Sequence, residues 1–365
     1  MTAADFAIVG AGIAGASLAA ELARGGAKVV LLEAEDQPGY HATGRSAAFW
    51  DECYGGPGVV PLTLASGPYL HNHGFLHPRG ALYLGREGSD ASLDGFLARY
   101  AGSGVTLERL TRDGIADQVP GLRPEWTDAI WEPACADIDV AGLHAHFLQK
   151  ARRHGAKVRC RARVVVAQRD AGVWQIAVAA GASVRAAVMV NAAGAWADGL
   201  AQLAGVRPLG IAPLLRTVVQ LRTDPAPPAD MPLVLDIDGN FYFKPEAGRV
   251  WLSPHDEIAC EPGDVAPDEL SVAMAIDRFQ NVVDWTVSGV ERRWAGLRSF
   301  APDRLPVFGP DPRVEGFVWF AGQGGFGIQT SPAAAKLMAQ RLLGNGSDPM
   351  TAAIDAAQYD PSRFD

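Results

Sequence analysis

The sequence predicts an α/β fold with two domains: a Rossmann-like domain and a second domain built on a mixed or antiparallel sheet. The chain opens with a strand, a helix and a second strand, and its middle part carries alternating strands between Pro- and Gly-rich turns. A length of 365 residues also favours two domains, since one domain usually holds about 100–200 residues. The 41 glycines and 25 prolines indicate many loops and close backbone approaches.

Composition narrows the class of protein. An apolar fraction of 48% with 20% charged residues is typical of a folded, soluble protein. The 32 basic and 41 acidic residues give a net charge of −9 without a Lys/Arg-rich run, so we expect no nucleic-acid partner. The four cysteines show no CxxC spacing, which argues against a zinc site or a disulfide scaffold. The apolar stretch Phe6–Ala20 is too short to span a membrane, and no Lys or Arg precedes it. We therefore expect a cytoplasmic protein without an integral membrane segment, either free or peripheral to the inner membrane face.

The first domain begins with a buried strand at Asp5–Gly10, a tight turn, a helix at Ala16–Arg24 and a buried strand at Lys28–Glu33. Both strands are apolar on both faces, which is typical of a parallel sheet covered by helices. From Pro38 to about Pro61 the chain is loop-like. The other expected elements are strands at Gly80–Leu84, Lys157–Val166, Trp174–Val178, Ala186–Asn191, Ile211–Arg222, Phe241–Pro245, Val250–Ser253 and Gly316–Gly322, and helices at Ser92–Tyr100, Gly142–His154, Asp268–Trp285 and Pro332–Leu343.

These elements divide the chain between two discontinuous domains. We assign residues 1–50, 140–210 and 290–345 to the Rossmann-like domain, residues 51–139 and 211–289 to the second domain, and residues 346–365 to a C-terminal tail.

A GxGxxG motif joins the first strand to the first helix. Gly10 permits the turn, Gly12 allows the backbone to approach a pyrophosphate, and Gly15 allows close packing of helix on sheet. Glu33, at the end of the second strand, is suited to bind ribose hydroxyls. A turn that only packs would leave this carboxylate without a role. The motif therefore predicts a dinucleotide site, in which Ile13 and Ala14 lie at the helix N-terminus.

A second loop favours FAD over NAD. It contains Gly44, Arg45, Ser46, Ala47 and Ala48, which supply backbone N–H groups, a hydroxyl and a guanidinium about ten residues beyond the acidic residue. The alternative interpretation is that this segment is an ordinary polar loop without a role in cofactor binding.

Two further segments suit close passage of the backbone past a cofactor. Val190–Trp196 is a buried strand that ends in small residues, although a core strand with a tight turn fits equally well. The glycines from Gly324 to Gly327 precede a helix, whose N-terminus would stabilise negative charge on a reduced flavin.

Five motifs together resemble the FAD-dependent D-amino-acid oxidase superfamily, and most closely its bacterial D-arginine-type dehydrogenases, beside glycine and sarcosine oxidases. They are GAGIAGAS, GYHATGRSAA, VNAAGAWAD, WAGLRSFAPDRLPVFGPDP and GQGGFGIQTSP, and they follow one another along nearly the whole chain. The resemblance implies noncovalent FAD, because neither attachment residue of the covalent flavoenzymes stands in its usual place. The residues that it implies for the cofactor, beyond those of the first two loops, are Val164, Ala193, Gly194, Trp196, Arg298, Gly324, Gly325, Gly327, Ile328, Gln329 and Thr330.

The resemblance also implies a site for a substrate carboxylate. Arg298 matches the family arginine that forms a bidentate pair with that carboxylate, and Arg216 matches a second one. An arginine on an apolar strand needs a partner, so a structural ion pair is the alternative for both. Tyr242 and Tyr54 match two site tyrosines, and bare tyrosines are otherwise packing residues. Gly325 and Gln329 are carried over as substrate contacts as well.

Two departures bear on the substrate. The chain has Phe49 where the most similar family members carry histidine, and Ala81 or a neighbour where they carry the glutamate that recognises a cationic side chain. We therefore expect a neutral or apolar substrate side chain.

The activity implied is oxidative deamination of a D-amino acid. Hydride transfer from Cα to flavin N5 would give an imino acid, which hydrolyses to a 2-oxo acid and ammonia. The sequence indicates no side chain that would act as a catalytic acid or base, and we expect the electron acceptor to be oxygen or a quinone. The alternatives are oxidation of a secondary amine, an imino acid or a 2-hydroxy acid on the same fold, and a noncatalytic electron-carrying subunit.

Other chemistries find little support in the sequence. The histidines at 71, 73, 77, 144 and 146 lack a pattern that ties them to a carboxylate, so we expect a solvated surface and no metal. A GxSxG elbow is absent, which argues against a serine hydrolase.

Overall fold

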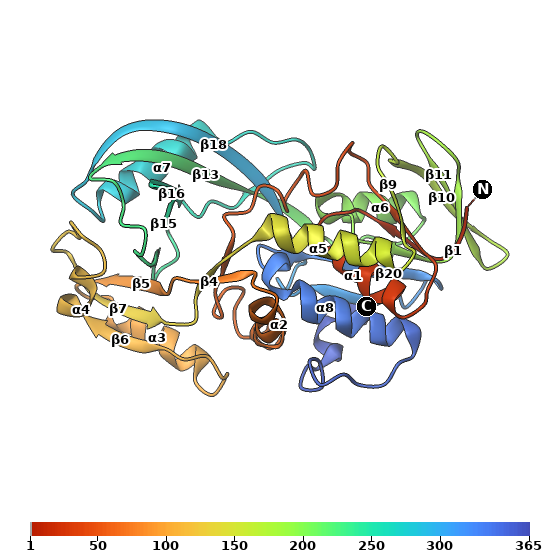
Figure 1. The fold of residues 1–365 in the computed structure, drawn as a ribbon, viewed down its shortest axis with the longest axis horizontal. Coiled ribbons are helices and arrows are strands. Elements are labelled where there is room, and N and C mark those ends of the chain that lie inside the picture. Colours follow the sequence, from red (N-terminus) through yellow and green to blue (C-terminus); the bar gives the residue numbers. More distant parts are fainter. Residues whose placement is uncertain (1) are drawn as a thin grey trace.

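The computed structural model describes residues 2–365 and shows two large sheets that lie side by side (Figure 1). The sheet at the right of Figure 1 has eight strands and the sheet at the left has ten. A three-stranded sheet, formed by β3 (Phe49–Trp50), β8 (Ala136–Ile138) and β4 (Leu76–Pro78), lies apart from both. This arrangement confirms the expected α/β fold class.

The eight-stranded sheet has a parallel core in the order β9, β2, β1, β12, β20. Antiparallel strands extend it, with β10 and β11 paired at one end of β12, and β19 paired with β20. The bounds are β1 (Thr2–Val9), β2 (Val29–Leu32), β9 (Lys157–Arg159), β10 (Val164–Asp170), β11 (Val173–Val178), β12 (Val184–Asn191), β19 (Val307–Pro310) and β20 (Phe317–Ala321).

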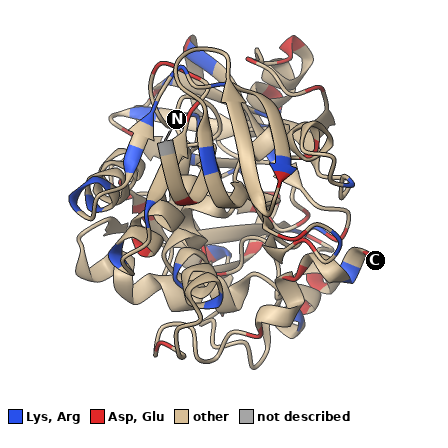
Figure 2. Ribbon diagram, turned by 90° about the vertical axis from the view of Figure 1, so that its right-hand side faces the viewer, with Lys and Arg blue, Asp and Glu red and all other residues tan. Residues whose placement is uncertain are grey.

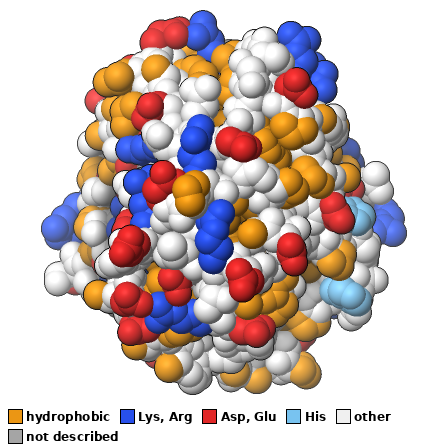
Figure 3. Space-filling model, turned by 90° about the vertical axis from the view of Figure 1, so that its left-hand side faces the viewer, with side chains coloured by type: hydrophobic (Ala, Val, Ile, Leu, Met, Phe, Trp, Pro, Cys, Tyr) orange, Lys and Arg blue, Asp and Glu red, His pale blue; other side chains and the backbone are white. Residues whose placement is uncertain are grey.

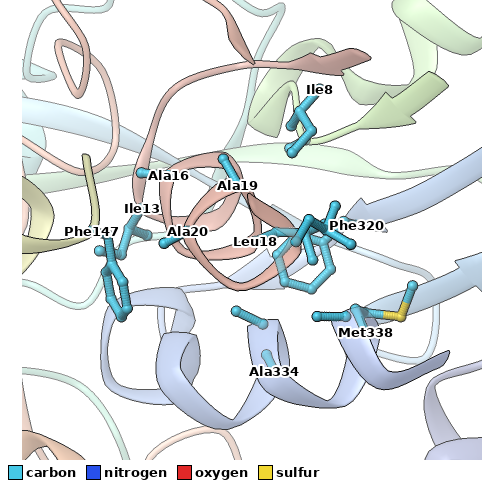
Figure 4. Close-up of a cluster of buried hydrophobic side chains, with 14 of the residues drawn as sticks. Ile8, Ile13, Ala16, Leu18, Ala19, Ala20, Phe147, Phe320, Ala334 and Met338 are labelled. Carbon is cyan, nitrogen blue, oxygen red and sulfur yellow. The ribbon is translucent and has the colours of Figure 1, made fainter. Parts of the chain in front are cut away.

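Three helices, α1 (Ile13–Arg24), α5 (Val140–Arg153) and α8 (Gly327–Leu343), cover one face of this sheet. Figure 4 shows α1 among apolar side chains of other elements, with Ile8 of β1 above it, Ala334 and Met338 of α8 below it, and Leu18 beside Phe320 of β20. Small side chains let helices approach closely, and this allows α1 to pack against both α5 and α8. The other face carries α6 (Ala197–Leu203) and a second apolar cluster.

The ten-stranded sheet is mixed, because β14 and β5 pair in parallel while the other pairs are antiparallel. Its order is β21, β18, β13, β16, β15, β14, β5, β7, β6, with β17 on β13. The strands are β5 (Ala81–Arg86), β6 (Glu108–Thr111), β7 (Trp126–Glu132), β13 (Ala212–Asp224), β14 (Leu233–Asp236), β15 (Tyr242–Glu246), β16 (Arg249–Ser253), β17 (Ile258–Ala259), β18 (Thr286–Phe300) and β21 (Gln323–Gly324), and the helices of this half are α3 (Asp90–Tyr100), α4 (Arg112–Ala116) and α7 (Glu269–Gln280).

Several elements were not predicted, namely the strands β3, β4, β6, β7, β8, β14, β17, β18, β19 and β21 and the helices α4 and α6. Four further differences concern α2 (Val60–Asn72), the strand expected at 157–166, α7 and α8. Helix α2 was not predicted, because Pro61 and Gly67 suggest a loop. Proline is tolerated in a first helical turn, and Gly67 leaves room for the ring of Trp50, which a Cβ would approach to 2.4 Å. The strand predicted at 157–166 is two strands, since the chain crosses over the end of β2 between them.

The other two corrections concern helix bounds. Helix α7 ends at Gln280, five residues earlier than expected. Helix α8 begins at Gly327, although Pro332 was expected to start it. Pro332 has no N–H for the carbonyl of Ile328, and the Ser331 hydroxyl donates to that carbonyl instead at 2.8 Å.

Two of the segments in the expected division into domains are placed differently by the structure. Residues 290–300, assigned to the Rossmann-like domain, belong to β18, which pairs with β13 over the whole length of that strand. The segment 346–365 packs against the body of the protein. Within it, Tyr359 is fully buried, and its hydroxyl donates to the Gly58 carbonyl at 2.8 Å.

Acidic and basic residues are interspersed on the two end faces of the molecule. Figure 2 shows this for the end that holds the eight-stranded sheet, and Figure 3 for the opposite end. Within residues 2–365, no helix has both the length and the apolar character that crossing a membrane requires.

Replacing Tyr359 tests how far the C-terminal segment contributes to stability. Tyr359→Phe should lower the free energy of unfolding by about 1 kcal/mol through loss of one hydrogen bond. Tyr359→Ala should lower it by about 3 kcal/mol or more, because it also leaves a cavity beside Phe308. Urea unfolding followed by circular dichroism measures both values. If Tyr359→Ala were as stable as the wild type, the packing of this segment would contribute nothing.

Candidate cofactor and active site

A pocket of about 450 Å³ is lined by residues of both large sheets. One end is formed by the carboxyl ends of β1 and β2 and by the segment after β12, and the other end by β13, β15 and β18. The carboxyl ends of parallel strands are the usual place for a ligand in such sheets. Both sheets therefore contribute to one site.

The GxGxxG turn is built by close backbone contacts. Gly10 has a φ of +103°, and a Cβ there would lie 2.3 Å from the Ala192 carbonyl oxygen. A Cβ on Gly15 would lie 1.9 Å from the Gly10 carbonyl oxygen. Neither position can hold a larger residue without movement of the backbone. The turn thus brings the N-terminus of α1 to the pocket wall, where Gly12, Ile13 and Ala14 lie.

The N-terminus of α1 has the donors that an anionic dinucleotide needs. Gly12 precedes the helix and caps it with no side chain, and the Thr43 hydroxyl accepts the Ile13 N–H at 3.0 Å. Glu33 is held at the end of β2, because its carboxylate accepts the N–H groups of Ala11 at 2.9 Å and Glu35 at 3.0 Å. A carboxylate fixed in this position, beside a glycine-rich helix start, suits ribose and pyrophosphate. Thr43 was missed, because a lone threonine in a loop carries no signal in the sequence.

The chain segment between β9 and β10 forms a further wall. The N–H groups of Arg161 and Ala162 donate to the carbonyls of Glu35 and Glu33, each at 2.7 Å. These bonds carry the segment across the end of β2, so that Ala162, Arg163 and Val164 line the pocket. Val164 therefore lies where the resemblance implied.

The loop after β2 lines the middle of the pocket, through Arg45, Ser46, Ala47 and Ala48. Ala48 has a positive φ of 59°, and its N–H donates to the Ser46 hydroxyl at 3.0 Å. The guanidinium of Arg45 was expected to face phosphates or the flavin. It instead forms an ion pair with Asp264 and donates to the Ala295 carbonyl at 3.2 Å. Arg45 thus joins the cofactor loop to the segment between β16 and α7.

The start of α8 forms the wall opposite this loop. Gly324, Gly325, Gly327 and Ile328 line the pocket, and Phe326 caps the helix without a side-chain hydrogen bond. A Cβ on Gly325 would lie 1.9 Å from the Tyr54 hydroxyl oxygen. Ala193, Gly194 and Trp196, after β12, complete the wall. An extended planar cofactor therefore fits between two helix N-termini.

Four of the residues expected to touch the cofactor or the substrate do not line the pocket. Gly15 and Gly44 each pack against backbone, with the carbonyl of Gly39 2.7 Å from a Cβ on Gly44. The amide of Gln329 donates to the Asp51 carbonyl at 3.0 Å and to the Thr63 hydroxyl at 2.9 Å. The Thr330 hydroxyl donates to the Phe326 carbonyl at 2.9 Å. The side chains of Gln329 and Thr330 point away from the pocket, since successive residues of a helix face different sides, and they support its wall through hydrogen bonds behind it.

Two buried arginines lie at the far end of the pocket. Arg216 on β13 is opposite Gly296 of β18, and Arg298 lies two residues further along β18. Residues at this diagonal spacing share one face of the sheet, so the two guanidiniums are neighbours. Arg216 is 6% and Arg298 9% exposed, and both line the pocket.

Acidic groups from the segment after β16 partly neutralise these arginines. Arg298 Nη2 donates to Glu257 Oε1 at 2.8 Å, and Arg216 Nε lies 3.6 Å from Asp256 Oδ1. Glu257 also pairs with the more exposed Arg304 at 2.7 Å. Burial and the neighbouring Arg298 lower the pKa of Arg216. Three guanidiniums thus face two carboxylates, which leaves one positive charge in excess among these five groups.

Some donors of the two arginines remain unpaired. Within residues 2–365, Arg216 Nη2 and Arg298 Nε are buried and have no hydrogen-bond partner. Both atoms are closed off from the pocket as well as from solvent, so it is the two adjacent guanidiniums lining the pocket, and not these two atoms, that indicate an anionic ligand. The Tyr54 hydroxyl accepts from Arg298 Nη1 at 3.2 Å, and the ring of Tyr242 lies beneath Arg216, 5.9 Å from its Cζ. The structure thus brings together the two arginines and the two tyrosines predicted for the substrate site, while Gln329 lies outside it.

Apolar and neutral side chains complete this end of the pocket. Phe49 packs its ring 5.8 Å from that of Tyr54 and 5.3 Å from that of Tyr242, and Val218 lies beside them. His255 packs against Tyr242 from outside, and burial and the two arginines lower its pKa to about 3. The lining residues with a carboxylate, Glu33 and Glu35, both lie at the opposite end.

His144 is a functional residue that the sequence analysis placed on the surface. It is buried on α5, and its Nε2–H donates to the Ala11 carbonyl inside the GxGxxG turn at 2.9 Å. Its ring also fills the space beside Gly39, where a Cβ would be 2.8 Å away. His144 therefore connects the two loops at the dinucleotide end. The signal available in the sequence was its apolar helix face, where Leu143 and Phe147 are buried as well.

The chain matches a known protein family over most of its length. The DAO family model, described as FAD dependent oxidoreductase, matches residues 5–341. FAD-dependent oxidoreductase domain-containing protein 1 of Bos taurus is 30% identical over 176 residues, 44% of this chain and 36% of that protein. Human mitochondrial dimethylglycine dehydrogenase is 25% identical over 404 residues, 99% of this chain and 44% of that protein. The chain thus spans less than half the length of these two relatives.

Solved structures of similar fold cover the chain almost completely. Glycine oxidase from Geobacillus kaustophilus superposes with a TM-score of 0.85 at 23% identity, covering 100% of this chain and 99% of that one. L-proline dehydrogenase from P. horikoshii gives a TM-score of 0.86 at 22% identity, covering 100% and 98%. Iminodiacetate oxidase from Chelativorans gives 0.79 at 24% identity, covering 98% of each chain. These likenesses confirm the two-sheet fold.

The role of His144 can be tested through affinity for FAD. His144→Phe should weaken FAD binding about five- to tenfold, because one neutral hydrogen bond contributes about 1 kcal/mol. His144→Gln, which retains a donor, should lie closer to the wild type. His146→Phe, on the partly exposed side of the same helix, is the matched control. Fluorescence titration of apoprotein with FAD gives the dissociation constants, and equal values for all four proteins would contradict the role.

Proposed function

This chain belongs to the DAO family of FAD-dependent oxidoreductases, and we propose that it oxidises the α-carbon of an amino acid with a neutral or apolar side chain, preferably of D configuration. The observation that carries the proposal is the pair of buried, neighbouring arginines that line the pocket. A carboxylate is the natural partner for two adjacent guanidiniums. The D configuration rests on the resemblance of the motifs to bacterial D-amino-acid dehydrogenases.

The lining of the pocket supports the side-chain preference. Phe49 and Val218 form an apolar wall, and Ala81 is fully buried in β5. No carboxylate lines this end of the pocket within residues 2–365. An ammonium or guanidinium on the substrate side chain would find no partner there, and burying it unpaired would be costly.

FAD supplies the acceptor for the two electrons that leave the substrate. The protein positions the substrate. Arg298 and Arg216 bind its carboxylate, while Tyr54 and Tyr242 fix the orientation of that group, so that Cα is held at a defined place in the pocket. No acid or base lines this end within residues 2–365, so the substrate binds with a neutral amine. The substrate loses two electrons and two protons to become an imino acid, and water then yields a 2-oxo acid and ammonia.

Oxidation of a secondary amine is the second candidate. The similarity to dimethylglycine dehydrogenase extends over 99% of this chain, and iminodiacetate oxidase shares its fold. The same arginines would bind the carboxylate of an N-alkylated amino acid. The two candidates differ in the nitrogen product, which is ammonia in one case and an alkylamine or amino acid in the other.

Anaerobic reduction of the bound flavin tests the proposal directly. Neutral D-amino acids should bleach the flavin absorbance, and D-arginine, D-lysine, L-amino acids and sarcosine should do so at least about tenfold more slowly. Repeating the reaction with oxygen and with a quinone identifies the acceptor. Fastest bleaching by sarcosine would favour the second candidate, and absence of bleaching by every amine would contradict both.

Replacing Arg298 tests the carboxylate site. Arg298→Met should raise KM about 10- to 150-fold, because a charged hydrogen-bonded pair contributes about 1.5–3 kcal/mol. Arg304→Met is the matched control, since Arg304 binds the same Glu257 oxygen from the exposed side. That control should change KM by less than about threefold. Steady-state kinetics measure both, and an unchanged KM in Arg298→Met would refute the assigned role.

A further inference from the structure

Two carboxyl groups lie together in the protein interior. One belongs to Asp51 of the active-site loop, which we define as residues 45–54, and the other to Glu132 at the end of β7. Asp51 is 1% and Glu132 0% exposed, and neither lines the pocket. One carboxylate oxygen of each residue and the Cys53 sulfur all lie within 4.8 Å of one another. The proposed function uses none of these three side chains.

The hydrogen bonds around the two carboxyls are almost complete. Asp51 Oδ1 accepts the Cys53 N–H at 2.8 Å, and Oδ2 accepts the Tyr83 hydroxyl at 2.5 Å. Glu132 Oε1 accepts the Glu52 N–H at 2.7 Å. Glu132 Oε2 is buried and has no donor within residues 2–365. This oxygen can be satisfied if it carries a proton and donates, since a protonated carboxyl is a donor.

No cation neutralises this pair. Within residues 2–365, neither Asp51 nor Glu132 forms an ion pair with Lys, Arg or His. The titratable groups that face the pair are acids, thiols and phenols: Glu52 and Cys53 of the loop, Tyr83 of β5, Tyr100 of α3 and Cys135 after β7. Two bare carboxylates this close in a dry interior repel each other strongly, so one of them must keep a proton.

We propose that Asp51 and Glu132 share one proton, held on Glu132, and that this acid pair is a positioning device for the active-site loop. The pair ties the loop to β5 through Tyr83 and to β7 through Glu132, while Gln329 ties the Asp51 backbone to α8. Phe49 and Tyr54, which line the substrate end of the pocket, lie on either side of Asp51 in this loop. Loss of the proton would leave two like charges and loosen the loop.

Burial, and then the neighbouring Asp51, raise the pKa of Glu132 well above its ordinary value. In the unfolded chain this carboxyl releases its proton near the ordinary value of 4.5. The folded state therefore holds a proton that the unfolded state has lost, and the free energy of unfolding falls as pH rises from that value up to the folded pKa. Glu132→Gln removes this dependence and preserves the contacts, since its amide donates as the protonated acid does.

The proton can be observed directly on the holoenzyme by infrared spectroscopy. The wild type at about pH 7 should show the carbonyl band of a buried protonated carboxylic acid, and Glu132→Gln should lack it. Glu108→Gln, on the exposed face of β6 next to β7, is the matched control and should keep the band. Absence of the band from the wild type overturns the proposal, and so does a stoichiometric divalent metal in the purified protein.

Stability and kinetics test the positioning role. The melting temperature of the wild type should fall between about pH 5 and about pH 9 by more than that of Glu132→Gln. Above the pKa of the pair, KM for the amino acid should rise about tenfold per pH unit in the wild type while kcat changes little, and Glu132→Gln and Asp51→Asn should lack this rise. A similar rise in both variants overturns the role. Only this kinetic comparison rests on the proposed function, because the infrared and melting measurements need no substrate.

Discussion

The pairing of β13 with β18 places two like-charged arginines side by side in the interior, and the rest of the substrate end depends on this constraint. The register sets Arg216 and Arg298 on one face of the sheet. Two buried cations repel each other and are poorly solvated, so they must be offset by negative charge. Asp256 and Glu257 provide part of it from outside the pocket. Both guanidiniums line the pocket, where the carboxylate of the proposed substrate would supply further negative charge.

A second pair of buried like-charged groups, in this case two carboxyl groups, lies at the active-site loop. Among residues 2–365, no cation pairs with Asp51 or Glu132, so in the proposed arrangement a proton takes the place of an ion pair. The loop between these two charge clusters carries Phe49 and Tyr54, and Gly325 leaves room for the Tyr54 hydroxyl. The aromatic wall of the pocket is thus held by hydrogen bonds on one side and by backbone approach on the other. Its position therefore depends on residues that never touch a ligand.

Local chemistry predicts structure best where it leaves few alternatives. A glycine-rich turn between an apolar strand and an alanine-rich helix is such a case, so the bounds of β1, α1 and β2 were predicted to within three residues. Local patterns mislead where tertiary contacts override them. Pro61 and Gly67 suggest a loop, but both lie in α2. Pro61 is tolerated in the first helical turn, and Gly67 leaves the space that the Trp50 ring occupies. Pro332 suggests a helix start but stands inside α8, because Ser331 satisfies the freed carbonyl.

The site divides in the same way. The sequence by itself predicted the dinucleotide turn and the acidic residue after β2, since each needs one residue type at one spacing, and the resemblance to a known family pointed to the two arginines. Only the tertiary structure decided which side chains face the ligand. It turned Gln329 and Thr330 away from the pocket, engaged Arg45 with Asp264, and placed His144 against the GxGxxG turn. It also brought Asp51 and Glu132, distant in the chain, into contact. The physical reason is that spacing along a chain specifies backbone geometry, whereas charge pairing and burial arise only between elements that folding brings together.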